Sequence, residues 1–431
     1  MKSTKNNIKY LGLIFIALAA LSMTNALAAQ RTVCFQLRLA DDRYNCAGTG
    51  EAGARRGCNN GGYVDAVGHQ VELWDKDSDG NDEFIGTWYI GGGGTQCIAF
   101  EWEGGDYFKG EANPDIYIRY VNIVNRTGYS NYISVKAVTT DGGNHPATSW
   151  RNGQSGDPNR YLANNCTSGT TCYMFPAGSL VPTNDVASSR ALRIMALDSA
   201  QHTLQIFGEV MNRHVKLHFP GKDDCPTSCA TDRENFHING SQGADGILTG
   251  HEIGHTIQMQ RFNQDNLRDD VSKGGNGWNL TSDEFDSGAT TEGFASYVGV
   301  VSWYEPNQVS TVPIGWGLNF DAAAPVNSTC SSNRGIPVQV AKGYWDVDDW
   351  NNEAGSGSTA GSDDDLSYRT EDIIIGWDFF PGGSGNREKN ESDRDGVNMR
   401  DYRENTNGWF TAAGYFETFI QHNCMQSQDN N

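Results

Sequence analysis

The chain has 431 residues, with 51 glycines, ten cysteines and a formal net charge of -21 at pH 7. This negative charge argues against a nucleic-acid-binding protein, because contacts to phosphates need a positive surface. The length permits two domains. The acidic, glycine-rich composition suits an extracellular protein with many loops, some of whose carboxylates could bind calcium.

Residues 1–28 have the pattern of an export signal peptide. Three early lysines precede an apolar run over residues 11–21, and a small-residue cleavage site follows at residues 26–28. The run is short for a membrane-spanning helix, and no later segment approaches the roughly 20 apolar residues that such a helix needs. We therefore expect a secreted or periplasmic protein without a membrane span.

The even number of cysteines predicts disulfide bonds, because exported chains fold in an oxidising compartment. Cys166 with Cys172, and Cys225 with Cys229, are close enough in sequence to close small loops. Spacing alone leaves the other pairings open, and the favoured ones join Cys34, Cys46, Cys58 and Cys97 among themselves and Cys330 with Cys424. No C-x-x-C pair is present, which argues against a zinc ribbon.

Residues 29–148 are predicted to form an all-β sandwich used as an accessory domain. Short β-rich runs alternate with turns that contain Gly, Asn and Asp, a spacing typical of sandwiches. Strands are predicted near residues 33–39, 116–121 and 132–138 from their composition and two-residue alternation. The segment from Val71 to Trp88, with the Pro114–Tyr117 run, resembles the transthyretin-like sandwich modules of secreted bacterial proteins.

Residues 149–186 are rich in Asn, Ser, Gly and Pro, and we predict a linker there. Residues 187–431 are expected to form an α+β catalytic domain. It would begin with an amphipathic helix capped by one of residues 184–185. Strands over 215–219 and 236–238 are predicted to precede a further helix.

That further helix carries the sequence H-E-x-x-H, from His251 through Glu252 to His255. On an α-helix, residues four apart lie on the same face, so two imidazoles can reach one zinc ion while the adjacent glutamate reaches a water beside it. Asp245 is expected to cap this helix. Glycines recur at every fourth position, leaving a bare face for close packing: Gly246, Gly250 and Gly254.

A catalytic zinc needs a third protein ligand and one open position. The metzincin pattern would place a histidine six residues after His255, but Arg261 stands there. Downstream, Glu292 begins the sequence E-G-F-A-S. H-E-x-x-H together with E-G-x-A resembles the gluzincin group of zinc peptidases over roughly residues 244–301. The resemblance implies a zincin-like domain in which both histidines and Glu292 bind zinc and Glu252 is the general base.

One position departs from this resemblance. In thermolysin-like gluzincins, an acid four residues after the glutamate ligand supports a zinc histidine, and here that position is Ser296. We therefore expect a different residue to take this role. Glu284 and Asp286 are alternative third ligands. Tyr297 is poorly placed to stabilise an oxyanion, whereas Tyr344 and Tyr368 are candidates between which the sequence does not choose.

Two other groups of residues invite metal-binding interpretations. Asp75, Asp77 and Asp79 resemble the start of an EF-hand calcium loop, but Gly86 occupies the position of the bidentate glutamate, so calcium binding and a solvated turn are both open. His214 and His218 are four residues apart in or beside a strand, where that spacing is about 13 Å. We interpret these histidines as surface or packing residues.

Two functions follow from these patterns, and a third alternative keeps the zinc but takes a non-peptide amide or ester as substrate. The first is a secreted zinc metallopeptidase acting on proteins or peptides, with an endopeptidase favoured over an exopeptidase. The second is a secreted zinc- or calcium-binding adhesion protein whose zinc site is structural or inactive. The presence of Glu252 between the histidines favours the first, because a structural site needs no base. The oligomeric state is not indicated by the sequence.

Overall fold

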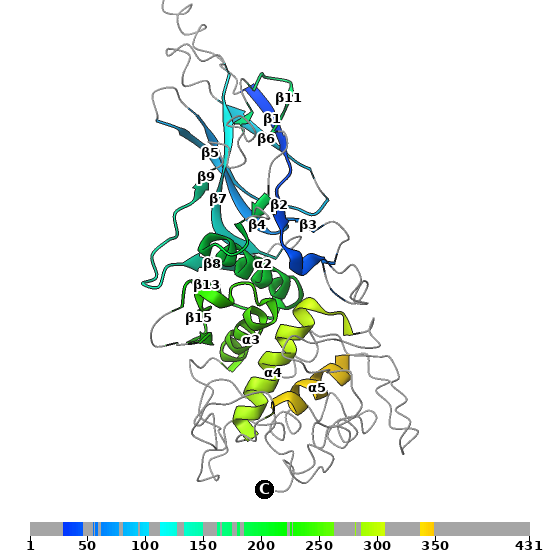
Figure 1. Ribbon diagram of the computed structural model, residues 1–431. Coiled ribbons are helices and arrows are strands. Elements are labelled where there is room, and N and C mark those ends of the chain that lie inside the picture. Colours follow the sequence, from blue (N-terminus) through cyan, green and yellow to red (C-terminus); the bar gives the residue numbers. More distant parts are fainter. Residues whose placement is uncertain are drawn as a thin grey trace, which may run out of the picture.

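Figure 1 shows the computed structural model of the chain, in which strands lie toward one end and helices toward the other. The predicted signal peptide, residues 1–28, lies outside the residues that the structure describes. Within the described residues, the chain combines β-sheets with α-helices, the mixed content that the sequence predicts. The structure describes residues 29–45, 55, 57–58, 62–76, 81–93, 95–102, 113–126, 133–149, 162–163, 166–174, 179–181, 185–221, 225, 227–262, 281, 286–306 and 337–348.

Most of the described strands precede the long helices along the chain. The strands are β1 (Ala29–Phe35), β2 (Arg38–Ala40), β3 (Tyr63–Asp65), β4 (His69–Asp75), β5 (Glu83–Tyr89), β6 (Gln96–Trp102), β7 (Ile116–Asn125), β8 (Ser134–Val138), β9 (Thr148–Ser149), β10 (Leu162–Ala163), β11 (Thr171–Tyr173), β12 (Ser179–Val181), β13 (Val215–His218), β14 (Cys229–Ala230) and β15 (Asn235–His237). The helices are η1 (Asp42–Tyr44), α2 (Ser189–Phe207), η4 (Gly240–Gln242), α3 (Gly246–Phe262), α4 (Asp286–Trp303) and α5 (Pro337–Asp348).

The largest sheet has nine strands and runs through both predicted domains. Its main path is β14-β15-β13-β8-β7-β4-β5, and β9 and β10 also pair with β7. Strands β5, β4, β7 and β8 are antiparallel, whereas β8, β13 and β15 are parallel. Strand β8 belongs to the predicted sandwich region and β13 to the predicted catalytic domain. One sheet therefore connects the two regions.

Two smaller sheets involve the segment predicted as a linker. One has the order β11-β1-β6 and the other the order β12-β2-β3. Strands β10, β11 and β12 all come from the predicted linker, residues 149–186, and pair with β7, β1 and β2 respectively. The described parts of this segment therefore supply strands to three sheets, so the segment is built into the fold.

Alternating side chains of the N-terminal strands enter the hydrophobic core. Val33, Phe35, Leu37 and Leu39 are each no more than 1 % exposed, as the predicted two-residue period requires. The run is divided between β1 and β2. Side chains from β1, β4, β6 and β7 belong to the same core cluster as those of α2, α3 and α4. The same core therefore supports the sheets and the helices.

Helix α2 lies between the sheet and the remaining helices. It packs against β7 and β8 on one side and against α3 on another. The prediction that residue 184 or 185 caps it is wrong: the hydroxyl of Ser188 accepts a hydrogen bond from the backbone N–H of Ala191 at 3.1 Å. Asp185 instead forms an ion pair with Arg190. Asp185 thus contacts an arginine side chain, whereas Ser188 accepts the hydrogen bond from the backbone at the start of α2.

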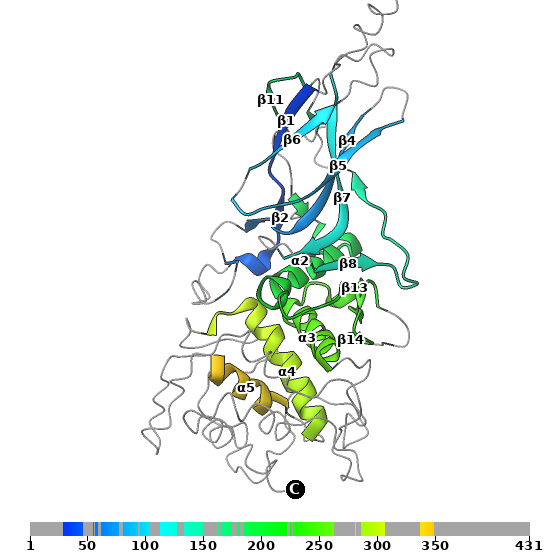
Figure 2. The same ribbon diagram turned by 180° about the vertical axis from the view of Figure 1, so that it is seen from behind.

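The helices follow one another outward from the sheet. After α2, which packs on the sheet, α3 packs against α2, α4 against α3, and α5 against α4. Figure 2 shows this succession from behind. Among the described residues, no helix is both long and apolar enough to cross a membrane. This order places the H-E-x-x-H helix between α2 and α4, where its side chains are enclosed.

Disulfide bonds join three pairs of cysteines within the described residues: Cys34–Cys97, Cys166–Cys172 and Cys225–Cys229. The first joins β1 to β6, where the two cysteines face each other in an antiparallel register. Two of these pairs are the predicted short loops, and Cys34–Cys97 lies within the group of four cysteines expected to pair among themselves. Cys58 is also disulfide-bonded, whereas Cys330 and Cys424 lie outside the described residues.

Candidate metal centre

The helix that carries H-E-x-x-H begins as predicted. The carboxylate Oδ1 of Asp245 accepts a hydrogen bond from the backbone N–H of Leu248 at 2.9 Å, so Asp245 caps α3. The helix continues to Phe262 without interruption. His251 and His255 therefore lie one turn apart on one face, and both are 2 % exposed.

Glycines bring α4 into direct backbone contact with α3. A Cβ atom added at Gly250 would lie 2.8 Å from the Cα of Gly299, and one added at Gly254 would lie 2.8 Å from the Cα of Ala295. Neither position leaves room for a side chain, because real Cβ atoms essentially never approach so closely. The predicted bare face of α3 is thus confirmed. It sets the short separation that lets an acid on α4 reach the histidines.

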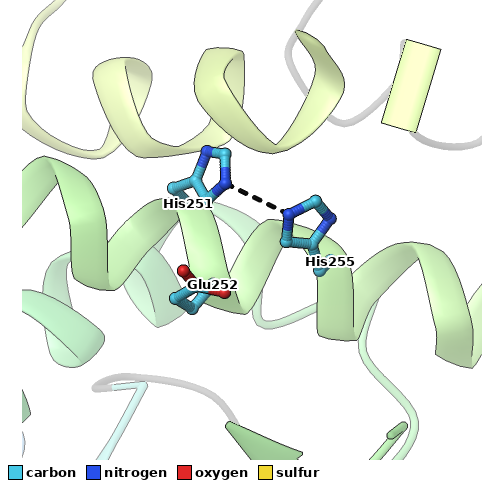
Figure 3. A group of neighbouring side chains, drawn as sticks. All are labelled: His251, Glu252 and His255. Carbon is cyan, nitrogen blue, oxygen red and sulfur yellow. Dashed lines mark hydrogen bonds between the residues drawn. The ribbon is translucent and has the colours of Figure 1, made fainter. Parts of the chain in front are cut away.

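That acid is Glu292, whose side chain is fully buried. Its Oε2 lies 3.2 Å from Nε2 of His251 and 3.3 Å from Nε2 of His255. The two Nε2 atoms are themselves 3.1 Å apart. Figure 3 marks this contact between the two imidazole rings with a dashed line. Three atoms that can each offer a lone pair therefore converge on one point. We call these three residues the metal-centre triad.

Glu252 lies on the same helix as the two histidines (Figure 3). It is 4 % exposed, and a carboxylate oxygen lies within 4.8 Å of the ligand atoms of His251 and His255. The structure thus brings together all four residues that the sequence singles out.

We expected a different residue to support a zinc histidine, but Ser296 itself contacts His251. Its hydroxyl oxygen lies 3.2 Å from Nδ1 of His251, the ring nitrogen that faces away from the triad. It also donates a hydrogen bond to the backbone carbonyl of Glu292 at 2.7 Å. The spacing of four residues from Glu292 is the sequence signal for this contact, because a hydroxyl at that position can also be a hydrogen-bond partner of the imidazole.

The alternative third ligands are not supported by a described contact. Glu284 lies outside the described residues. Asp286 begins α4, so its Cα is about 9 Å along the helix axis from that of Glu292. Among the oxyanion candidates, Tyr344 is buried and packs against Phe294 on α4 at 5.5 Å between ring centroids. Tyr368 lies outside the described residues.

The other histidines that the sequence singled out do not form a site together. His218 lies on β13, is 6 % exposed and stacks on His237 with ring centroids 4.3 Å apart. Its Nε2 is 2.9 Å from the side-chain oxygen of Asn235. His214 instead accepts a hydrogen bond from the backbone N–H of Ser134. Both are packing or surface residues, as the strand geometry predicts.

The proposed calcium loop is described only in part. Asp75 is fully buried at the end of β4. Its carboxylate accepts hydrogen bonds from the indole N–H of Trp102 at 3.0 Å and from the backbone N–H of Asp115 at 2.7 Å. These bonds give Asp75 a structural role. Asp77 and Asp79 lie outside the described residues, so calcium binding stays a prediction.

Comparisons with known proteins do not assign a family. No protein-family model matches the chain, and no curated protein matches it. A 9R-lipoxygenase from Cyanothece PCC8801 is similar over 46 % of this chain and 28 % of its own chain, with 14 % identity and a TM-score of 0.19. A TM-score this low carries no argument about fold or function. The function has to be inferred from the metal centre itself.

Proposed function

We propose that this chain is a zinc-dependent metallopeptidase in which the metal-centre triad, His251, His255 and Glu292, binds the ion and Glu252 is the general base. One observation carries the proposal: three buried ligand atoms lie 3.1 to 3.3 Å from one another. Such atoms are costly to bury unless a proton or a cation lies among them. The combination of two imidazoles and a carboxylate suits zinc.

The separations fit the coordination geometry of zinc. Bonds of about 2.0 to 2.1 Å in a tetrahedron place neighbouring ligand atoms about 3.3 to 3.4 Å apart. The three observed separations of 3.1, 3.2 and 3.3 Å lie close to this edge length. Three ligands would leave the fourth corner for water or substrate, as in catalytic zinc sites.

The positions of Glu252 on α3 and Glu292 on α4 favour different roles for these two acids. Glu252 follows His251 directly, so the α-helix turns its side chain about 100° away from the face shared by the histidines. It lies within 4.8 Å of their ligand atoms, a distance that one water molecule can bridge. Glu292 reaches both imidazoles from α4, with its Oε2 at 3.2 and 3.3 Å from their Nε2 atoms. We therefore assign Glu292 as ligand and Glu252 as base.

The proposed reaction is hydrolysis of a peptide bond. When bound, zinc supplies Lewis acidity, which polarises a carbonyl group and makes water a better proton donor. Glu252 accepts a proton from the attacking water and then donates it to the amine that leaves. The buried surroundings of Glu252 keep its carboxylate out of bulk solvent, which favours proton exchange with the reacting groups over exchange with solvent.

The finer predictions about architecture and location belong to this proposal. We infer a secreted or periplasmic enzyme with a zincin-like catalytic region, supported by a β-rich region that resembles a sandwich. The disulfide bonds support an oxidising compartment. The sequence of α2, strands β13 to β15, α3 and α4 supports a zincin-like arrangement. The substrate is proposed to be a protein or peptide, with internal cleavage favoured.

A second function is favoured by the burial of the site. Glu292 is 0 % exposed, the histidines 2 % and Glu252 4 %. An enclosed site is typical of structural zinc, which would suit a secreted adhesion or binding protein. The two functions differ in one measurable property, because a structural ion is bound without turnover of peptides.

Metal removal and reconstitution test the proposed function on the full mature chain. The purified protein should contain about one zinc ion per chain and should hydrolyse casein or a mixture of fluorogenic peptides. A chelator should abolish hydrolysis, and zinc, but not calcium, should restore it. Hydrolysis that survives complete removal of zinc would contradict the mechanism. Stoichiometric zinc without hydrolysis of any peptide would instead favour the structural alternative.

A further inference from the structure

Ser296 occupies a defined place between the ligand helix and one zinc histidine. It lies one helical turn after Glu292 on α4, and its side chain is fully buried. The same hydroxyl oxygen has two partners, the backbone carbonyl of Glu292 at 2.7 Å and Nδ1 of His251 at 3.2 Å. It therefore connects the backbone of one ligand to the imidazole of another.

The chemistry of these partners fixes where the protons lie. A carbonyl oxygen can only accept, so the single hydroxyl proton of Ser296 is donated to Glu292. Toward His251, the hydroxyl oxygen can then only accept. The proton must therefore be on Nδ1 of His251, which donates it to Ser296. In a neutral imidazole this leaves Nε2 with its lone pair. Nε2 is the atom that faces Glu292 and His255.

We propose that Ser296 is a positioning residue that holds His251 in the Nδ1–H tautomer and so prepares Nε2 for the metal. The inference rests on the proposed function, because the metal is the reason the tautomer matters. Metal-bound histidines generally donate their other N–H to an acceptor that fixes the ring and the tautomer. Here the acceptor is a neutral hydroxyl, which adds no negative charge to the centre.

Removing the hydroxyl of Ser296 should allow His251 to adopt its other neutral tautomer. Without Ser296 as an acceptor, the Nε2–H form of His251 gains relative stability, because Nε2–H can donate to the nearby carboxylate of Glu292. That form has no lone pair on Nε2 and must lose its proton before it binds a metal. Ser296→Ala should therefore weaken zinc binding by about ten-fold or more, the usual effect of losing such a partner.

The helix supplies a matched control. Ser302 is also buried on α4, and its hydroxyl likewise donates to the carbonyl four residues earlier, that of Val298, at 2.7 Å. Its other contact is the hydroxyl of Thr203 at 2.9 Å, not an imidazole. Ser302→Ala therefore removes the same kind of backbone contact, while Ser296→Thr keeps a hydroxyl that can bond to the preceding turn.

Two measurements on the full mature chain test the proposal. Nitrogen-15 NMR of histidine-labelled, metal-free protein, at a pH where imidazole is neutral, reports the tautomer of His251. The dissociation constant for zinc is measured by competition with a chelator. The wild type, Ser296→Thr and Ser302→Ala should all show the Nδ1–H tautomer and similar zinc affinity. Ser296→Ala should shift toward the Nε2–H form and bind zinc about ten-fold more weakly.

The outcomes separate this role from the proposed function. A wild-type Nε2–H tautomer, or a Ser296→Ala variant with unchanged zinc affinity, would overturn the role of Ser296. So would an equal loss of zinc affinity in Ser302→Ala, because packing alone would then explain the effect. If the wild type binds no zinc, the proposed function fails, but the tautomer measured without metal still decides whether Ser296 fixes His251.

Discussion

Two buried polar clusters in this chain contain similar side chains but differ in how their polar atoms are paired. The metal-centre triad consists of two histidines and a glutamate between α3 and α4. A second cluster, which we call the sheet–helix cluster, consists of His69 on β4, Tyr120 on β7 and Asp198 on α2. Nδ1 of His69 is 3.2 Å from the Tyr120 hydroxyl, and its Nε2 is 3.2 Å from Oδ1 of Asp198.

Protons complete the sheet–helix cluster. Burial, together with a smaller contribution from the neighbouring His202, lowers the pKa of His69 to about 3. Burial also raises the pKa of Asp198 to about 8. At neutral pH a protonated Asp198 therefore donates to Nε2 of His69, and the Nδ1–H of His69 donates to Tyr120. These two hydrogen bonds join the sheet to α2 through neutral side chains.

The triad lacks this alternation, because its ligand atoms are directed at one another rather than at separate partners. Burial of His and acid side chains therefore does not by itself indicate a metal. Convergence of three lone-pair atoms on one point is the stronger sign. The comparison can be tested by removing residues from each cluster and measuring metal content, turnover and stability.

The largest effect is expected when a ligand is removed from the triad. Glu292→Ala should reduce zinc content and peptide hydrolysis to background, because two imidazoles alone hold zinc weakly. Asp286→Ala, at the start of the same helix, is the matched control and should keep both, as should Glu284→Ala. Metal analysis beside a peptide-cleavage assay checks the prediction. Normal zinc content in Glu292→Ala would exclude Glu292 as a ligand.

A smaller effect is expected from the base. Glu252→Gln keeps the shape of the side chain but removes its ability to accept a proton, so turnover should fall by about 10² or more. Zinc content should stay at the wild-type level, since the triad is intact. The pair of readouts distinguishes a base from a ligand. Undiminished turnover in this variant would end the assignment of Glu252.

The smallest effect concerns the pH dependence of stability. The folded state keeps the Asp198 proton up to about pH 8, while the unfolded chain loses it near 3.8. The resulting stabilisation is complete below that lower value and is lost as the pH rises to 8. His69 has the opposite effect, with stability rising between about pH 3 and 6.5. Between pH 6.5 and 8, His69 no longer changes the stability, and only the loss of stability from Asp198 continues.

Asp198→Asn should isolate this contribution. The amide can still donate a hydrogen bond to His69, but it does not titrate. Between pH 6.5 and 8, the unfolding free energy of the wild type should fall more steeply than that of the variant, by up to about 1.4 kcal/mol per pH unit. Urea unfolding of the zinc-free proteins measures it, with the exposed Asp141→Asn as control. Parallel pH profiles of wild type and Asp198→Asn would contradict the neutral pair.

Local features of the fold were predictable because local physics produces them. The four-residue spacing of His251 and His255 and the cap at Asp245 each depend on one turn of helix. The recurring glycines predicted close packing of α3 against a neighbour, and Gly254 indeed contacts Ala295. The contact of Ser296 with His251 was not predicted, because the expected partner at this position was an acid, whereas an imidazole N–H needs only an acceptor.

Long-range pairing was not predictable in the same way. Parallel strands β8 and β13 are separated by a long connection, and nothing in the composition of either strand names its partner. The strands from residues 149–186 are two or three residues long, too short for a periodic signal. The predicted linker and the boundary beside it depended on composition, which reports turns but not the strands between them.

The pairing of β8 with β13 also limits how the chain can be divided. A fragment that ends near residue 148 would leave β8 with an unpaired edge, and one that begins near residue 187 would leave the same on β13. Exposed edges offer free N–H and C=O groups to any other strand, and such fragments tend to associate. In the intact chain, β8 and β13 pair with each other, so neither strand exposes this edge. Through β8, the β-rich region thus supplies the strand that pairs with β13 and covers the edge of the short strands that precede the H-E-x-x-H helix.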